Sequence, residues 1–523
     1  MCFSRIFLPV LIFLIIPVNY YTNSFLFNAK GVKISVSDKN LKPSIQTASS
    51  FKTTSLAKNQ KERERLFHNK IGIHITKEEL AIWRERAKKG PYKTKGDVSE
   101  NSPGDWDRII RNANKFLLDP YKEIWKGDPS KGCVQKYSAH PSTEGVKLRD
   151  AAFVYLIKKE NIYLNAVKKN LLAQANEPLT DFSNHNRWCE DVLYDVNPAF
   201  SIAEWLTRLL LAYDYTKDGF ENEEKAAIER WFKDAAYFFY RNTNPGLNKL
   251  FVDREKNDHR LSSYAMAVKV NKLTAVSSED GWKIPSLAKS YNNRRAVMMR
   301  FVAFTGILIN DDKLKNSAKV FVKEWLKFSV FPDGVVGEFE RWKENFPDLG
   351  WAYASSVISA NLDIADALAR DGDFELYKFS TSEGYFGTEG GNKSLLLTAR
   401  TLVNFLDGTV KKHIPISAGK EPKFDPYIDG IIVEKNWFTV NDIWLSVANV
   451  YFQDEYLKNN YLRKSSKRLP YPSADKLATT GPHQPWSGVG AIYPGILFMF
   501  GKMDGKVWPY PIEKDEVKAG LNK

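Results

Sequence analysis

Cysteine and histidine are scarce in this 523-residue chain, which has three cysteines and seven histidines. The sequence has no H-E-x-x-H motif, no paired C-x-x-C motif and no clustered histidine triad, so it predicts no metal site and no cofactor. Cys2 precedes the first apolar run, which leaves Cys133 and Cys189 for the rest of the chain. These two residues form either one disulfide or none, and the fold does not depend on a cystine framework.

The N-terminal apolar run, residues 6–18, is also short. It spans about thirteen residues after a short start that carries Arg5, which is typical of a signal-peptide core and too short for a confident membrane span. We therefore expect a signal peptide at 1–24 and an exported protein, periplasmic or secreted, with no stable membrane insertion after cleavage. The alternative is a retained N-terminal anchor, because no small-x-small cleavage site precedes Tyr20. Residues 25–60 are polar and without periodicity, which predicts a flexible arm.

Positive charge exceeds negative charge, and the formal net charge is +14 with a pI near 9.2. Such a balance favours polyanions through long-range steering. Nucleic acid would be attracted equally, but the basic residues are spread along the chain and no nucleic-acid-binding motif appears, so we expect no nucleic-acid partner. Aromatic residues make up 13% of the chain. Most must be core residues, yet this richness also suits a carbohydrate cleft.

Amphipathic helical runs alternate with short Pro, Gly and Asn connectors over most of the chain, which predicts a mostly α protein of antiparallel helix pairs. We expect one large domain at 61–523, an (α/α) toroid, because such folds grow by adding hairpins around one axis. The stretch 407–450 mixes β-branched and aromatic residues and predicts minor irregular or β content near the C-terminus. The predicted helical runs are 150–172, 199–216, 221–241, 260–272, 290–309, 312–329, 350–370 and 393–406.

The segment 331–368 places polar and aromatic residues just before a long helix. Ala354, Val357 and Ile358 begin an apolar stripe at steps of three and four. A turn signature precedes it at Pro332, Asp333 and Gly334, followed by the pair Glu338 and Arg341, and then by Trp351 and Tyr353. This arrangement is either a catalytic rim or a surface ion pair followed by two packed aromatic residues.

Two more polar clusters precede predicted helices. His259 lies in the segment 256–270 with Asn257 and Arg260, either as a site residue or as a solvated helix cap. The loop 183–191 is either a sugar-binding and carboxylate-binding element or a polar connection between helices. Its binding candidates are Asn184, His185, Asn186, Arg187 and Trp188.

Together the segments around His259 and Tyr353 resemble the alginate lyase family of (α/α) toroid polysaccharide lyases. In that family an Asn-His pair opens a helix, and a Glu-x-x-Arg pair and a tyrosine follow an Asp-Gly turn. The resemblance implies that Tyr353 is the proton donor and that His259 and the Glu338–Arg341 pair belong to the site, with His259 and Arg341 catalytic and Glu338 binding substrate. The neighbouring Asn257, Arg260 and Trp351 are further candidates to bind substrate. The sequence departs from the family in carrying Asp258 beside His259, and in separating Arg341 from Tyr353 by twelve residues that include Pro347.

A lyase acting on a 4-linked uronic acid must remove the C5 proton beside a carboxylate and expel the O4 oxygen. Donors that bind or neutralise the carboxylate stabilise the charge that develops on it, and Asn257, His259 or Arg260 is suited to this role. A tyrosine whose pKa is lowered by a nearby cation serves as base or acid. If both groups leave on one side, Tyr353 does both jobs. If they leave on opposite sides, neutral His259 takes the proton and Tyr353 gives one.

The sequence therefore predicts a polysaccharide lyase acting on an alginate-like or glucuronan-like polyanion by β-elimination. One alternative is a glycoside hydrolase on the same scaffold, which needs two carboxylates roughly 5 to 10 Å apart. Glu338 with Asp333 or Asp253 offers such a pair. The other alternative is a non-catalytic glycan-binding protein.

Overall fold

A computed structural model of the chain describes only part of the sequence. All of the described residues belong to the compact unit Lys58–Lys523, so the expected signal peptide and the unit Met1–Ala57 lie outside them. The described residues are 67, 69–89, 105–120, 125–128, 133–137, 141–176, 196–243, 291–330, 334, 336, 349–384, 387–406, 443–454, 456–457, 492–494 and 499.

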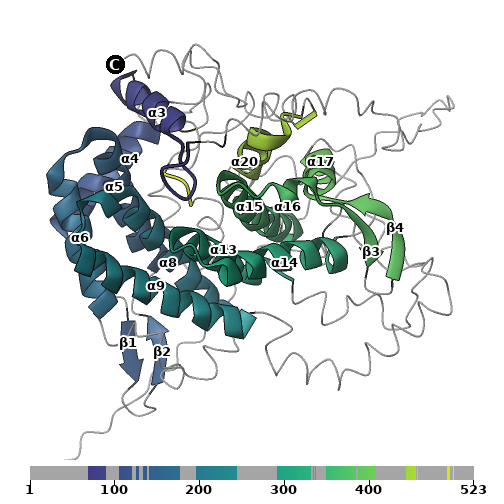
Figure 1. Ribbon diagram of the computed structural model, residues 1–523, viewed down its shortest axis with the longest axis horizontal. Coiled ribbons are helices and arrows are strands. Elements are labelled where there is room, and N and C mark those ends of the chain that lie inside the picture. The colour runs from purple at the N-terminus through teal and green to yellow at the C-terminus, as the bar shows by residue number, and fades with distance from the viewer. Residues whose placement is uncertain are drawn as a thin grey trace, which may run out of the picture. The chain divides into compact units, whose positions relative to one another are not determined.

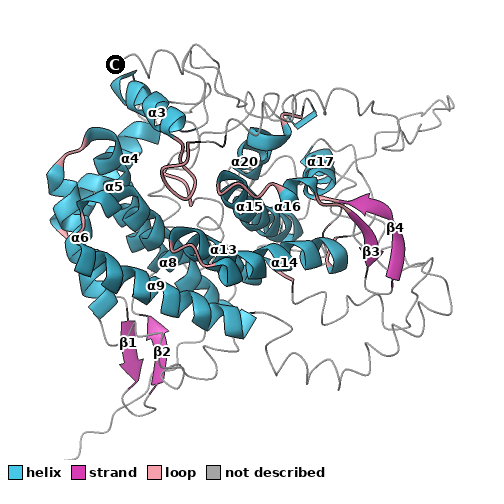
Figure 2. Ribbon diagram, in the orientation of Figure 1, coloured by secondary structure: helices cyan, strands magenta, loops and turns pink. Residues whose placement is uncertain are grey.

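The described part of the chain is mostly helical, as the sequence predicts, and 80% of its residues are in helices (Figure 2). The longer helices are α3 (Lys77–Lys89), α4 (Asp105–Leu118), α5 (Pro141–Lys158), α6 (Asn161–Asn176), α8 (Val196–Thr216), α9 (Asn222–Thr243), α13 (Asn293–Leu308), α14 (Asp312–Phe328), α15 (Leu349–Arg370), α17 (Leu395–Leu406) and α20 (Ile443–Phe452). Two short helices are η4 (Lys217–Gly219) and α16 (Glu375–Lys378).

Within the described residues, the strands form two antiparallel hairpins rather than an extended sheet (Figure 2). The first hairpin pairs β1 (Trp125–Asp128) with β2 (Cys133–Tyr137), and the second pairs β3 (Thr381–Gly384) with β4 (Gly387–Lys393). The second hairpin packs beside α14 (Figure 1). The described part of the fold is therefore built from helices, with two small hairpins added to them.

Two predictions about elements are wrong. The single helix expected at 150–172 is two helices, because Lys159 adopts a left-handed conformation with φ 60° that ends α5 before α6 begins. In the mixed stretch 407–450, which was expected to hold irregular or β content, residues 443–450 form the start of helix α20, and residues 407–442 lie outside the described residues. Val447, Ala448 and Val450 are buried there and α20 packs against α15 and α17, so tertiary burial overrides the β propensity of its residues. The run expected at 260–272 lies outside the described residues.

The helices lie in two layers that differ in burial (Figure 1). The inner layer is α5, α8, α13, α15 and α20, each in contact with the next. In α13 every residue from Arg295 to Ile307 is buried, and in α15 every residue from Ala354 to Arg370 is buried. A helix that is buried on all sides lies inside a larger assembly of helices rather than at its surface.

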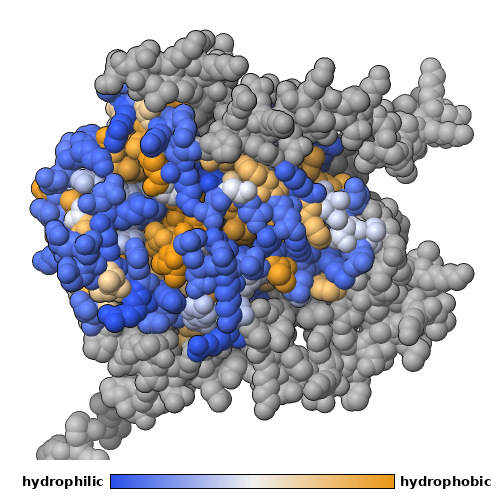
Figure 3. Space-filling model, in the orientation of Figure 1, coloured by the Kyte–Doolittle hydropathy of each residue, from blue (hydrophilic) through white to orange (hydrophobic). Residues whose placement is uncertain are grey.

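The outer layer is α6, α9 and α14, and each of its helices buries one face. In α14 the buried residues recur at helical spacing, among them Leu314, Phe321 and Trp325. Adjacent outer helices contact one another, and α14 contacts α13 and α15. Much of the described surface is hydrophilic on the face that Figure 3 shows. The chain thus alternates between the layers, α5–α6, α8–α9 and α13–α14–α15.

The tight connection between α13 and α14 shows how local chemistry fixes this alternation. Gly306 lies so close to α14 that a Cβ there would come within 2.9 Å of the Leu314 Cβ and of the Lys315 backbone nitrogen. Asn310 turns the chain with φ 54°. Asp311 then caps α14, because its Oδ1 accepts from the backbone nitrogens of Lys313 at 3.1 Å and Leu314 at 3.2 Å.

The inner helices run parallel to one another. Asn293 Nδ2 donates a long hydrogen bond to Ser356 Oγ at 3.4 Å, and Arg300 Nη1 contacts Asp363 Oδ2 at 2.8 Å. Both pairs join residues 63 positions apart, so α13 and α15 advance together in the same direction. In the same way, Gly145 of α5 lies against Arg208 of α8, and Phe153 packs on Tyr215 about two turns later in both helices. Within each of these two pairs, both helices therefore begin at the same end.

The segment 67–76 covers the C-terminal ends of α8 and α15. The Ile73 backbone nitrogen donates to Asp214 Oδ2 at 2.8 Å, and His74 Nε2 lies 2.6 Å from the Tyr215 hydroxyl. Lys70 pairs with Asp371, directly after α15. This end of the inner helices is therefore closed by the chain itself.

Candidate functional site

Two of the predicted site residues lie in described elements. Trp351 and Tyr353 are the third and fifth residues of α15, close to the end opposite the covering segment 67–76. Tyr353 precedes Ser356 by one helical turn and Asp363 by ten residues, and these positions fall on one face of a helix. Ser356 and Asp363 contact α13, so α15 packs against α13 along the turns that follow Tyr353.

The remaining predicted site residues lie outside the described residues, so the structure neither brings them together nor separates them. The catalytic candidates in this group are His259 and Arg341. The binding candidates are Asn184, His185, Asn186, Arg187, Trp188, Asn257, Arg260 and Glu338.

The turn that precedes the site is present around Gly334. Val330 and Val336 form an antiparallel bridge, so the chain reverses direction there, as the Pro332, Asp333 and Gly334 signature predicts. Gly334 has φ 88°, a conformation that favours glycine, and an added Cβ would come within 2.4 Å of Thr401 Oγ1. Only glycine therefore fits this turn against α17, which fixes the chain on its way to α15.

An amide pair that the sequence interpretation missed opens α13. Asn292 is the N-cap, and its side chain accepts from the Arg295 backbone nitrogen at 3.1 Å. Asn293 follows, fully buried, and reaches Ser356 on α15. The sequence shows two asparagines directly before an apolar run, which indicates a helix cap but not that Asn293 contacts α15.

A buried ionic network joins the inner helices α8, α13 and α15. Along α13 and α15 it lies further from the helix starts than the contact between Asn293 and Ser356. Arg300 of α13 contacts Asp363 of α15 at 2.8 Å and Glu204 of α8 at 2.6 Å. Glu204 also contacts Arg208 at 2.9 Å. All four side chains are at most 3% exposed. Two carboxylates and two guanidinium groups balance one another, which is the condition under which buried charges are tolerated.

The electrostatics of this network favour a structural role. Burial raises the pKa of Asp363 to about 7, and the Arg300 guanidinium opposes that rise. Burial lowers the pKa of Arg300, but Glu204 and Asp363 outweigh it and raise the pKa overall. Burial lowers the pKa of Arg208 to about 10. We infer that Asp363 is ionised while it is paired with Arg300. A protonated Asp363 would leave one of the two guanidinium charges of the network without a carboxylate to balance it.

His74 is a buried histidine at the covered end. Its ring lies edge-on to those of Tyr215 and Tyr493, with centroids 5.6 and 5.0 Å away. Burial first, and then the charge of Arg370, lower its pKa to about 3. His74 is therefore neutral at physiological pH, and it lies at the end of the inner helices opposite Tyr353.

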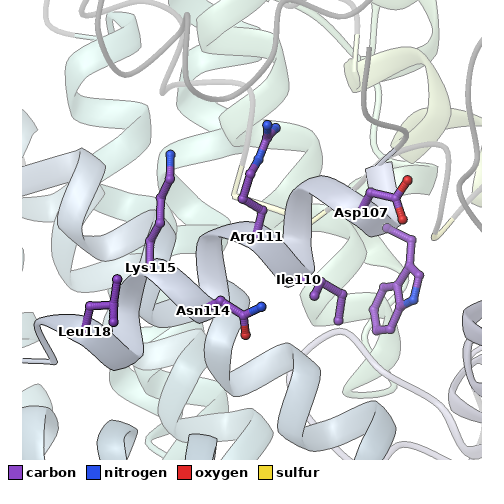
Figure 4. Close-up of a pocket in the computed structure, with 7 residues that line it drawn as sticks. Asp107, Ile110, Arg111, Asn114, Lys115 and Leu118 are labelled. Atoms are coloured by element: carbon purple, nitrogen blue, oxygen red, sulfur yellow. The ribbon is translucent and has the colours of Figure 1, made fainter. Parts of the chain in front are cut away.

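One surface pocket, with a volume of about 440 Å³, lies on α4 (Figure 4). Arg111 and Lys115 project from the same side of this helix, as the close-up shows. None of the predicted site residues lines the pocket. The lining residues are Trp106, Asp107, Ile110, Arg111, Asn114, Lys115 and Leu118.

Within the part of the chain that the structure describes, no three His, Cys, Asp or Glu residues gather in a way that would hold a metal ion. No described helix is both long and apolar enough to cross a membrane. Comparisons with protein-family models and with curated proteins find no match for this sequence.

Proposed function

We propose that this protein is a polysaccharide lyase that cleaves a 4-linked, uronic-acid-containing polyanion by β-elimination. The observation that carries the proposal is the contact between Asn293 and Ser356. This contact joins the start of α13 to the turn of α15 that follows Tyr353. An amide donor and a tyrosine at one end of parallel helices are the groups that this chemistry needs.

The scaffold proposed for this reaction is an (α/α) toroid. The alternation of buried inner helices with one-sided outer helices supports it, as does the parallel direction of neighbouring inner helices. In such an arrangement the loops before α8, α13 and α15 gather at one end. The predicted binding loop at 183–191, the His259 segment and the Glu338–Arg341 pair all precede these helices in the sequence.

In the proposed reaction the amide of Asn257 binds the uronate carboxylate and stabilises the negative charge that develops on it, while buried Asn293 holds the start of α13 against α15. Tyr353 or His259 removes the C5 proton. The electron pair of the broken C5–H bond forms the C4–C5 double bond, and the C4–O4 bond breaks. Tyr353 gives a proton to the departing O4, so the products are a new chain end and an unsaturated uronate.

The signal-peptide interpretation makes this lyase an exported enzyme, in the compartment where a polymeric substrate is found. N-terminal sequencing of the mature protein tests this part of the proposal. A mature chain that begins near residue 25 supports export, and one that begins at Met1 contradicts cleavage.

Ultraviolet absorbance tests the reaction, because the C4–C5 double bond conjugated with the carboxylate absorbs and a hydrolysis product does not. Wild type, Tyr353→Phe, His259→Ala and Asn293→Ala are incubated with alginate, glucuronan and neutral dextran. Tyr240→Phe, a half-buried tyrosine on outer helix α9, is the matched control. The proposal expects absorbance with a polyuronate for wild type and Tyr240→Phe, and its loss in Tyr353→Phe. New reducing ends without absorbance would indicate a hydrolase.

A further inference from the structure

A stripe of four lysines runs along α14 at every fourth residue, so that all four lie on one face. The helical rise separates successive lysines by about 6 Å. Each of them contacts carboxylates of the segment 371–383, which follows α15. The four lysines are Lys315, Lys319, Lys323 and Lys327.

The partners follow one another in the same order along the seam. Lys315 contacts Asp371 at 3.2 Å, and Lys319 contacts Asp373 at 2.7 Å. Glu375 lies between Lys319, at 3.0 Å, and Lys323. The last pair is Lys327 and Glu383, at 2.6 Å. The ion-pair partners of all four lysines carry a carboxylate, which is the charged group of a uronic acid.

The seam becomes steadily more exposed along its length. The lysine side chains are 15%, 19%, 27% and 34% exposed from Lys315 to Lys327. Their carboxylate partners are 21%, 34%, 47% and 60% exposed from Asp371 to Glu383. Exposed ion pairs contribute little to stability, so the pair at the Lys327 end is the one that an outside carboxylate exchanges with most readily.

The exposed end of the seam lies at the same end of the helices as Tyr353. Phe328, next to Lys327, packs on Tyr291 with ring centroids 5.6 Å apart. Tyr291 directly precedes Asn292 and α13, whose first residue contacts Ser356 on α15. Lys393 of β4 also donates to the Lys327 backbone oxygen at 2.6 Å, which holds the hairpin at this place.

We propose that Lys327 forms an accessory subsite for a carboxylate of a uronic-acid polysaccharide, and that Glu383 occupies this subsite in the free protein. The polymer carboxylate displaces the Glu383 carboxylate, and Lys327 exchanges one ion pair for another. This inference rests on the proposed function for its substrate class, but it concerns binding and not bond cleavage.

Binding without turnover tests the subsite. The dissociation constant of alginate is measured by calorimetry in the Tyr353→Phe background at fixed salt, with neutral dextran as the blank. Glu383→Gln removes the competing carboxylate and is expected to tighten binding about threefold, whereas Lys327→Gln is expected to weaken it by a similar factor. In the Lys327→Gln background, Glu383→Gln is expected to have no effect, because there is no cation left to release.

A change of net charge alone also shifts polyanion binding in these directions, so a matched pair serves as control. Lys158 and Glu160 form an ion pair of similar exposure, 38% and 48%, between α5 and α6. Glu160→Gln and Lys158→Gln are expected to change the dissociation constant less than their counterparts do. The proposal is overturned if Glu383→Gln matches Glu160→Gln, or if it acts equally with and without Lys327.

The outcomes separate the two proposals. If Glu383→Gln leaves the dissociation constant of alginate unchanged, the subsite proposal is wrong and the lyase proposal stands. If the dissociation constants change as expected but the wild-type protein forms no unsaturated product, the subsite proposal stands and the lyase proposal is wrong. No binding of alginate or glucuronan by the Tyr353→Phe protein overturns the subsite together with its substrate class.

Discussion

Arg300 and Asp363 meet at 2.8 Å with no more than 3% of either side chain exposed, and their separation of 63 residues equals that of Asn293 and Ser356. The equal spacing means that one shift of α15 along α13 would break both contacts. The buried ion pair therefore fixes the position of α15 along α13, and with it the position of Tyr353 along that direction. Specifying one register is the best-attested use of buried polar groups.

The first prediction concerns the stability that this pair provides. Asp363→Ala leaves Arg300 without one of its two buried carboxylates and is expected to lower the free energy of unfolding by about 3–5 kcal/mol. Asp312→Ala is the control, because Asp312 pairs with Lys315 at 2.9 Å but is 82% exposed. Its expected cost is under about 1 kcal/mol. Urea denaturation measures both, and equal losses would contradict the role of the buried pair.

The second prediction concerns pH and His74. Its pKa is about 3 in the folded protein and 6.5 in the unfolded chain, so between these values the unfolded state binds the extra proton. The stabilisation is fully present above pH 6.5 and is lost as the pH falls toward 3, with a total of at most about 5 kcal/mol. His74→Gln is expected to flatten the stability profile between pH 5 and 6.5, where most carboxylates stay ionised. Parallel profiles for the two proteins would show that His74 does not titrate in this way.

The third prediction separates backbone strain from steric clash at the turn before α15. Gly334→Ala meets both, because φ is 88° and Thr401 Oγ1 would lie 2.4 Å from the new Cβ. Gly372→Ala meets strain alone, since φ is 97° and nothing lies within 4 Å. We expect a loss of about 1 kcal/mol at Gly372 and a clearly larger loss at Gly334. Thermal unfolding compares them, and equal shifts would mean that the turn does not press against α17.

The fourth prediction concerns Asn293. Asn293→Ala is expected to cost about 1 kcal/mol of stability and to lower kcat/KM on a polyuronate by about 10-fold to 100-fold, because the start of α15, which carries Tyr353, is then positioned less precisely. Asn170→Ala is the matched control, because Asn170 is also buried and donates one hydrogen bond, to the Pro120 oxygen at 2.7 Å. The control is expected to lose stability and keep its activity. Equal activities for the two variants would remove Asn293 from the site.

The sequence predicted most of the described helices because their periodicity is a local property. The run at 312–329 coincides with α14, and the run at 350–370 coincides with α15. It failed at Lys159, where one left-handed residue divides a continuous periodic run. It also gave no sign of the pairing between Arg300 and Asp363, since a contact across 63 residues leaves no mark on the pattern of either helix.

The candidate site was predicted less completely than the fold. Tyr353 was placed at the start of a helix, and α15 does begin four residues before it. Asn293 was missed, because its importance appears only when α13 and α15 are seen to run parallel. Site residues that come from different loops are joined by tertiary structure, and a single sequence shows their types and order but not their proximity.

Mass spectrometry of the product formed in heavy-oxygen water tests the proposed reaction most directly. β-Elimination breaks the glycosidic bond without adding water, so the products of a uronic polysaccharide should carry an unsaturated end and no oxygen from the solvent. The same digestion with Tyr353→Phe should give no product. Saturated products that contain solvent oxygen would contradict the lyase and identify a hydrolase.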